Sequence, residues 1–285
     1  MNKTGRTVED PICLQGPPRG NLYIYYLEGH LNPASRIDAD AFIGNWQEDN
    51  SSFLFFSQPA DELVETLLAQ HAEVVLLDRY QMTYDEWHGG PLEVLRIAGF
   101  DIVPPWKTAA TEMSGRRIVL DPGVVFGTGT HPTTRDCLFA LEKVFSTGAI
   151  DTVLDLGTGT GLLALAAARL GAGQVIAVDF NLLAVKTALR NIRLNRLEHR
   201  IVAVQGMAEN FIDFPSDLMV SNIHFDVMQR LLTAGALSKT KWFILSGLLR
   251  SQAKEVTTLL ERQPTQILQT WERDGIWHTF FGKVC

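Results

Sequence analysis

The nine residues Val153-Leu-Asp-Leu-Gly-Thr-Gly-Thr-Gly161 decide the fold class of this chain. They begin with a short apolar run and lead into Leu162–Leu170, a segment with helical spacing that stops at Gly171. Glycines at alternate positions let backbone amides and a ligand approach one another where side chains would collide. The first turn of the following helix adds the positive end of its dipole, which suits a carboxylate or a phosphate. The stretch therefore predicts a strand, a tight turn and a helix that together bind a ligand.

The second half of the chain repeats this alternation of apolar runs and helical segments. Apolar strands that alternate with helices indicate a parallel sheet covered on both faces. Near the end, Asp274-Gly275 separates two strand-like runs, 267–272 and 276–284, which is a hairpin signal. We therefore predict an α/β fold, a Rossmann-like, doubly wound, mostly parallel sheet with a terminal antiparallel hairpin. The apolar runs lie at 153–154, 175–178, 201–204, 218–220 and 242–245, and the helical segments at 182–195, 226–237 and 250–262.

The first part of the chain has a different pattern. Strand-like runs rich in aromatic or β-branched residues lie at 22–27, 53–56 and 74–77, and residues 59–68 have a helix entry followed by helical spacing. These elements predict a small α+β domain, and the glycines and prolines after it indicate a linker. The predicted division is 1–90 for the small domain, 91–115 for the linker and 116–285 for the ligand-binding domain.

The composition excludes several classes of protein. Of the 285 residues, 46% are hydrophobic and 20% are charged, which is a globular composition and excludes wholesale disorder or a fibrous repeat. No apolar run approaches the roughly 18 residues of a membrane span, and the first residues lack the apolar core of a secretion signal. Cys13, Cys137 and Cys285 are far apart, which argues against a disulfide framework or a cysteine zinc site. We expect a cytoplasmic protein with no metal site and no membrane partner.

The net charge of −7 is unevenly distributed. Residues 1–115 hold 7 Lys+Arg against 17 Asp+Glu, whereas residues 116–285 hold 18 against 15. Nucleic-acid-binding proteins normally carry a basic face, so we expect no direct nucleic-acid partner. The asymmetry indicates two parts with different partners, although an acidic surface also serves solubility.

Two carboxylates at predicted strand ends are candidate ligand contacts. Asp155 lies within the glycine stretch and could accept a hydrogen bond from a ligand ammonium group. Asp179 comes 22 residues after Gly157, at a position where an acid can accept both ribose hydroxyls of an adenosine. Asp is also a common helix N-cap after a strand, but the joint spacing favours ribose binding. The predicted cofactor contacts of this region are Asp155, Gly157, Gly159, Gly161 and Asp179.

The spacing of the glycines distinguishes between two candidate cofactors. The dinucleotide fingerprint Gly-x-Gly-x-x-Gly would place its third glycine at position 162, which is Leu162. The spacing Asp-x-Gly-x-Gly-x-Gly is instead typical of S-adenosylmethionine-dependent methyltransferases. Ribose recognition by Asp179 suits both cofactors and does not choose between them. We predict S-adenosylmethionine, and a nicotinamide-dependent oxidoreductase is the less favoured alternative.

Two further stretches add site residues. Residues 120–134 contain more Gly and Thr than a helix cap needs, and we interpret them as a loop that closes over the charged amino-acid end of a ligand. Within residues 217–224, Asn222 lies at the C-terminal end of a predicted strand, where open parallel sheets place their sites. Both stretches therefore belong to the predicted cofactor site.

These stretches together resemble the ribosomal protein L11 methyltransferase family, over roughly residues 85–285. That family trimethylates amino groups of a ribosomal protein with S-adenosylmethionine. The resemblance implies cofactor contacts at Thr134, Gly157, Asp179 and Asn222. The matching stretches are LDPGVVFGTGTHPTT at 120–134, VLDLGTGTG at 153–161, VIAVD at 175–179, SNI at 221–223 and ILSGLL at 244–249.

The resemblance implies a protein-lysine methyltransferase whose first domain recognises a lysine-bearing protein, with a ribosomal protein as one candidate. The family's first domain is a compact ferredoxin-like unit, but residues 28–52 leave little room here for its first helix. A small-molecule methyltransferase with the same catalytic core is therefore the alternative.

Asn222 is the candidate catalytic residue. A lysine nucleophile must lose its proton, and its side-chain pKa in water is about 10.4, so the acceptor must be desolvated. The side-chain carbonyl of Asn222 could then steer the lone pair of the neutral amine. Superfamily members that methylate amides or adenine follow this Asn with Pro-Pro-Tyr or a similar sequence. Ile223-His224-Phe225 follows here, which argues against those acceptors.

Overall fold

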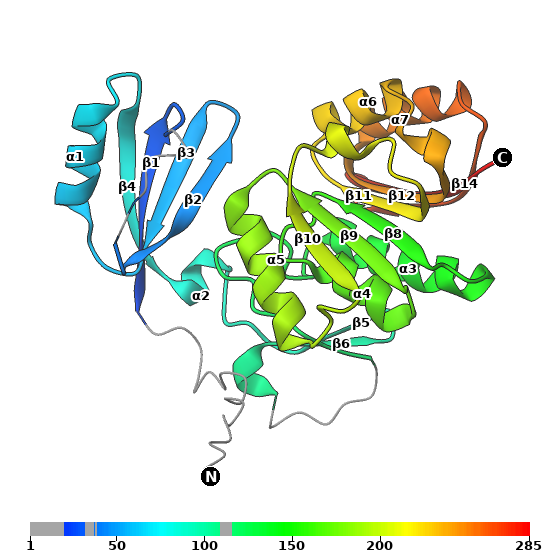
Figure 1. The fold of residues 1–285 in the computed structure, drawn as a ribbon, viewed down its shortest axis with the longest axis horizontal. Helices are drawn as coiled ribbons and strands as arrows, with labels where there is room; N and C mark the ends of the chain where they lie inside the picture. Colours follow the sequence, from blue (N-terminus) through cyan, green and yellow to red (C-terminus); the bar gives the residue numbers. More distant parts are fainter. Residues whose placement is uncertain (1–19, 32–36, 38, 109–115) are drawn as a thin grey trace, which may run out of the picture.

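The second half of the chain is built on a seven-stranded sheet (Figure 1). The computed structural model describes residues 20–31, 37, 39–108 and 116–285. Five neighbouring strands of the sheet are parallel, and the last two form an antiparallel hairpin. In spatial order the strands are β10 (Ile201–Gln205), β9 (Gln174–Asp179), β8 (Thr152–Leu156), β11 (Ser216–Asn222), β12 (Thr240–Leu249), β14 (Trp277–Val284) and β13 (Thr265–Arg273).

Helices cover both faces of this sheet (Figure 1). Because alternate residues of a strand point to opposite faces, the adjacent Val153 and Leu154 of β8 enter two different apolar cores. On the face of Val153 lie α3 (Pro132–Thr147), α4 (Leu162–Leu170) and α5 (Leu182–Leu194), and on the face of Leu154 lie α6 (Phe225–Thr233) and α7 (Arg250–Glu261).

The predicted α/β class and terminal hairpin are confirmed. Asp274 and Gly275 turn the hairpin with φ of +57° and +66°, as a type I′ turn requires. The helix predicted over 226–237 ends early, because the chain turns at Gly235 with φ of +77°. It continues as a short 3₁₀ segment, η3 (Ala236–Lys239).

The first part of the chain forms an antiparallel sheet of four strands, in agreement with the predicted α+β unit. In spatial order they are β2 (Phe42–Glu48), β3 (Ser51–Phe56), β1 (Asn21–Glu28) and β4 (Val75–Thr83), with α1 (Asp61–Gln70) between β3 and β4 in the chain. Strand β2 was not predicted, because its polar residues and central Gly44 hide the apolar alternation. Between β1 and β2 the described residues contain no helix, and residues 32–36 and 38 lie outside the description.

The segment predicted as a linker, 91–115, contributes strands of its own. β5 (Leu95–Ile97) and β6 (Phe100–Val103) join β7 (Arg116–Val119) in a three-stranded sheet. Phe100 and Ile102 of β6 pack into the same core as α3 and α4. Gly99 of this segment therefore lies at a turn between two short strands, and the exact domain boundaries stay a prediction.

The four-stranded sheet contacts the rest of the protein through a separate apolar cluster. Ile24 and Phe55 pack there with Val124 and Leu183. Gly44 on β2 lies so close to α5 that a Cβ at this position would come within 2.5 Å of the Leu183 side chain. Part of the sheet face opposite α1 is therefore held against the loop before α3 and the start of α5.

Asn191, fully buried on α5, holds three segments together. Its Oδ1 accepts a hydrogen bond from the backbone N–H of Asp121 at 2.9 Å. Its Nδ2 donates to the carbonyl oxygens of Asp121 at 3.0 Å and Thr160 at 2.9 Å. The loop before α3 and the glycine turn before α4 are thereby fixed to the same helix.

Replacing this amide should destabilise the protein. Asn191→Ala leaves a buried backbone N–H and two buried carbonyl oxygens without this partner, so we expect the free energy of unfolding to fall by about 3 kcal/mol. Urea unfolding measures the change, and Asn210→Ala at an exposed position serves as the control. Equal stabilities of the two variants would contradict this role.

Candidate functional site

Three predicted site residues meet at the carboxyl edge of the seven-stranded sheet. Asp155 and Asp179 lie near the ends of the adjacent strands β8 and β9, and Asn222 ends β11 on the other side of β8. The strand order reverses between β8 and β11, and open α/β sheets bind ligands in the crevice at such a point. The sheet topology thus brings residues together that lie far apart in the sequence.

The turn between β8 and α4 must be glycine at two positions for steric reasons. Gly157 has φ of +74°, and a Cβ there would collide with the side chain of Ile223. Gly159 has φ of +54°, and a Cβ there would lie 2.8 Å from the carbonyl oxygen of Phe126. Gly161, the third predicted glycine, is the N-cap of α4. The turn therefore presents bare backbone at the sheet edge.

Asp179 is buried, and both its carboxylate oxygens accept hydrogen bonds from backbone amides. Oδ2 accepts from the N–H of Gly159 at 3.0 Å, and Oδ1 accepts from the N–H of Asn181 at 2.9 Å. Burial raises the pKa of Asp179, and these two hydrogen bonds oppose the shift. The alternative role as a helix N-cap is wrong, because Asn181 caps α5 by accepting from Leu183 N–H at 3.0 Å. Each oxygen of Asp179 keeps a lone pair with which it could accept a ligand hydroxyl.

Asp155 lies beneath the glycine turn, only 1% exposed. The Thr158 hydroxyl donates to its Oδ2 at 2.6 Å, which links the strand to the turn. Burial raises the pKa of Asp155 to about 7, the hydrogen bond from Thr158 opposes this shift, and the charge of Asp179 adds to it. A direct contact of Asp155 with a ligand ammonium stays a prediction, and its hydrogen bond with Thr158 was not predicted from the sequence.

Asn222 and Thr134 come together across the edge of the sheet. The Asn222 Nδ2 donates to the Thr134 hydroxyl oxygen at 3.4 Å, although 88 positions separate them in the chain. Thr134 is buried in the first turn of α3, which places the loop 120–131 directly over this edge. The two residues that the family resemblance selected from distant stretches are therefore neighbours.

The loop 120–131 is tied to the glycine turn. Thr160, between two of the glycines, donates its hydroxyl to the carbonyl oxygen of Gly127 at 2.8 Å. At the end of the loop, His131 caps α3, and its Nδ1 lies 2.7 Å from the Thr133 hydroxyl. The structure places this loop against the glycine turn, and its closure over a ligand stays a prediction.

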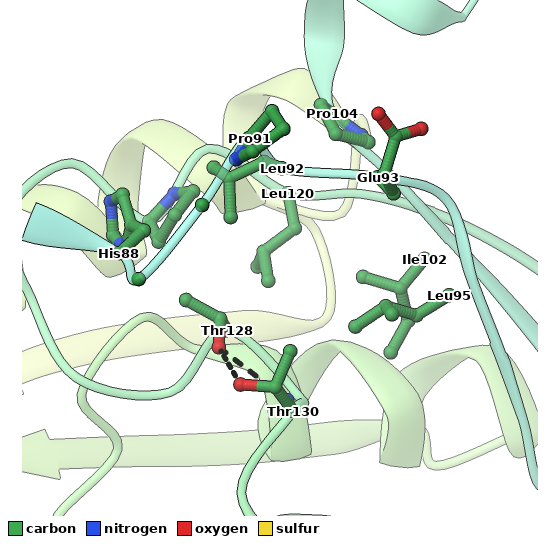
Figure 2. Close-up of a pocket in the computed structure, with 13 residues that line it drawn as sticks. His88, Pro91, Leu92, Glu93, Leu95, Ile102, Pro104, Leu120, Thr128 and Thr130 are labelled. Carbon is green, nitrogen blue, oxygen red and sulfur yellow. Dashed lines mark hydrogen bonds between the residues drawn. The ribbon is translucent and has the colours of Figure 1, made fainter. Parts of the chain in front are cut away.

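An open cavity of about 190 Å³ borders this loop (Figure 2). Thr128 and Thr130, which hydrogen-bond to each other at 2.7 Å, line it together with apolar side chains. His88 is also part of its wall and lies 2.9 Å from the Gly123 carbonyl oxygen. The loop is therefore packed on the glycine turn at Gly127 and borders open space at its threonines.

Three aromatic rings, those of Phe126, His131 and Trp277, pack together beside the first turn of α3. The His131 ring lies 5.4 Å from the ring of Phe126 and 4.8 Å from that of Trp277. Burial lowers the pKa of His131. Phe126 is 60% exposed. No sequence signal connected Trp277 with the site, because it begins the terminal hairpin strand β14, far from the motifs.

Comparison with known proteins decides the family. A family model described as ribosomal protein L11 methyltransferase (PrmA) matches residues 51–284. The chain belongs to this family. It is 38% identical to the ribosomal protein L11 methyltransferase of Anoxybacillus flavithermus, over 98% of this chain and 90% of that protein. The protein of the same name from Geobacillus thermodenitrificans is also 38% identical, over 88% of this chain and 82% of its own length.

A solved structure agrees with this assignment. The crystal structure of a ribosomal protein L11 methylase from Lactobacillus delbrueckii subsp. bulgaricus is 29% identical and has a TM-score of 0.58. It covers 66% of this chain and 96% of its own chain. The predicted family resemblance, the Rossmann-like class and the methyltransferase activity are thereby confirmed. Membership in a methyltransferase family implies the use of S-adenosylmethionine.

Neither a metal-binding cluster nor a membrane-spanning helix occurs among the described residues. Within the described ranges, no group of three or more His, Cys, Asp or Glu side chains could hold a metal ion. In the part of the chain that the structure describes, no helix has the length and apolar character to cross a membrane.

The raised pKa of Asp155 makes a prediction about stability. An aspartate in the unfolded chain has a pKa of about 3.9. Between this pH and about 7, the folded protein therefore binds one proton more than the unfolded chain does. The free energy of unfolding should therefore fall as the pH rises through this window. Asp155→Asn should remove this slope. The free energy of unfolding of the variant, relative to that of the wild type, should therefore be about 3 kcal/mol higher at pH 8 than at pH 5.

Urea unfolding at several pH values tests this prediction. Asp213→Asn, at an exposed position, is the matched control and should keep the wild-type slope. A slope that persists unchanged in the Asp155→Asn protein would show that another group carries it.

Proposed function

We propose that this protein transfers methyl groups from S-adenosylmethionine to lysine amino groups of ribosomal protein L11. The observation that carries the proposal is the family match over residues 51–284, with relatives of this name 38% identical over most of the chain. The meeting of Asp179, Gly159 and Asn222 at one sheet edge supports it. The separated cysteines fit a cytoplasmic location, where ribosomal proteins are made.

The residues at the sheet edge fit S-adenosylmethionine. Asp179 is oriented by two backbone amides and would accept the ribose hydroxyls. A Cβ on Gly157 or Gly159 would collide with Ile223 or with the Phe126 carbonyl oxygen, so the turn keeps a bare backbone, and the cofactor would lie against this backbone. Thr134 and the loop before it would lie over the amino-acid end. When bound, the cofactor supplies a methyl group on a sulfonium that carries its own leaving group.

The chain contributes alignment and desolvation for methyl transfer. Holding two reactants in a near-attack geometry can supply about 7–11 kcal/mol of a barrier. Asn222 is fixed by its hydrogen bond to Thr134, and its side-chain carbonyl would orient the lone pair of a neutral lysine amine. The acceptor amine must also be desolvated, because burial disfavours the charged ammonium. The rings of Phe126 and Trp277, which pack on His131 beside the first turn of α3, would contribute to this desolvation.

Removing the ribose contact should weaken cofactor binding. Asp179→Ala deletes both oriented oxygens, so we expect the Kd for S-adenosylmethionine to rise more than about tenfold. Calorimetry on the folded variant measures the change, and Asp213→Ala is the control at an exposed position. Unchanged affinity in the Asp179 variant would count against this placement of the cofactor.

A labelled-methyl assay with purified ribosomal protein L11 tests the function itself. We expect label on lysine side chains of the protein, and Asn222→Ala should lower kcat about 100-fold because the acceptor is misplaced. Asn210→Ala should leave kcat unchanged. A parallel assay offers the enzyme a cellular metabolite fraction. Label in that fraction and none on L11 would favour the small-molecule alternative and show that the proposed substrate is wrong.

A further inference from the structure

The four-stranded sheet has one face that α1 covers and one that is only partly covered. On the covered face, the Tyr25 hydroxyl accepts from the N–H of Ala60 beside α1, and Arg79 pairs with Asp61 of α1 at 3.3 Å. Because strand neighbours point to opposite faces, Tyr26 lies on the other face. Figure 1 shows α1 on the side of this sheet that is away from the seven-stranded sheet.

An aromatic row crosses this second face. Strand register places Trp46 opposite Phe53, Phe53 opposite Tyr26, and Tyr26 opposite Asp78. The Tyr26 and Phe53 rings are stacked, with centroids 4.7 Å apart and planes at 3°. The three rings are partly exposed, and Tyr80, also on this face, is 41% exposed. The cluster around Ile24 therefore leaves these rings accessible.

The charge on this face has one sign. The four strands, all of which the structure describes, contain the acids Glu28, Glu48 and Asp78 and the single base Arg79. Arg79 is turned to α1, as its ion pair shows, and the three acids are exposed. A face with aromatic rings and exposed carboxylates, and with no Lys or Arg from its own strands, suits a segment rich in Lys or Arg, because cations bind to ring faces and to acids.

This face is continuous with the methyl-transfer site. The carboxylate of Glu48, at the end of β2, lies 2.9 Å from Nε2 of His224. His224 is the N-cap of α6 and follows Asn222 by two positions. A chain bound along the aromatic row would therefore end next to the strand tip that carries the candidate catalytic residue.

We propose that this face, the aromatic row with Glu28, Glu48 and Asp78, binds a basic segment of the lysine-bearing protein substrate and leads it to Asn222. The inference rests on the proposed function and adds the surface that recognises the substrate. Opposite charges on the two partners raise the rate of encounter as well as the affinity. A second copy of this chain is a poorer occupant, because the chain carries a net charge of −7.

The test measures binding of ribosomal protein L11 to the full chain by calorimetry, separately from methylation. The variant Glu28→Gln/Glu48→Gln/Asp78→Asn should raise the Kd for L11 about tenfold at low salt. The difference from wild type should shrink as the salt concentration rises, because exposed charges are screened. A Trp46→Ala variant should raise the Kd about threefold to fivefold at any salt concentration.

The control variant carries the same change in charge elsewhere on the surface, Glu62→Gln/Asp213→Asn/Glu255→Gln, and should bind L11 as wild type does. All variants should keep the wild-type affinity for S-adenosylmethionine, which separates a binding defect from misfolding. Wild-type methylation of L11 together with unchanged binding by the face variants would overturn the surface. If the wild type binds L11 without methylating it and the face variants weaken this binding, the proposed function is wrong and the surface is supported. If the wild type neither binds nor methylates L11, both are wrong. Dimers of the wild type that the face variants abolish would assign the face to a second copy instead.

Discussion

Close packing at the glycine turn 157–161 is the constraint on which the rest of the site depends. A Cβ on Gly157 or Gly159 would collide with Ile223 on one side and with the loop at Phe126 on the other. The turn can therefore exist only as bare backbone pressed between two other segments. The same backbone orients Asp179, because the N–H of Gly159 donates to its carboxylate. Sterics and hydrogen bonding thus fix one geometry, in which the ligand would contact main chain where other proteins offer side chains.

The loop 120–131 connects this turn with the first part of the chain. Asp121 is buried and accepts from the Tyr84 hydroxyl at 3.1 Å, while its other oxygen lies 2.9 Å from the Arg190 guanidinium. Burial, followed by the charge of Asp121, raises the pKa of Tyr84 far above its ordinary value, so the hydroxyl remains a donor. The segment leaving β4, the loop and α5 therefore share one buried polar group. A shift of the four-stranded sheet would be transmitted to the loop that covers the site.

Much of the larger sheet and of the site could be predicted from the sequence, because both follow from patterns that are local. The helix over 162–170 was predicted to the residue, since Gly161 and Gly171 bound an unbroken apolar segment. Strand β2 and the strands within 91–115 were missed, because short strands with polar or glycine positions carry little periodicity. The neighbours Thr158 and Trp277 were missed for a different reason. Their contacts arise from the turn geometry and from the fold of the whole sheet, which no spacing in the sequence reveals.

The outer strand of the smaller sheet has a consequence for how the protein avoids self-assembly. β4 is an edge strand of nine residues with exposed Val75 and Leu77, so its outer backbone groups could template a foreign strand. A bulge opposite Tyr26 and Leu27 breaks its register, and Asp78 and Arg79 follow directly. An irregular, charged rim resists the addition of another chain along the hydrogen-bonding direction. The edge strand β4 therefore resists the addition of further strands, while the aromatic row on the adjacent face of the sheet stays accessible.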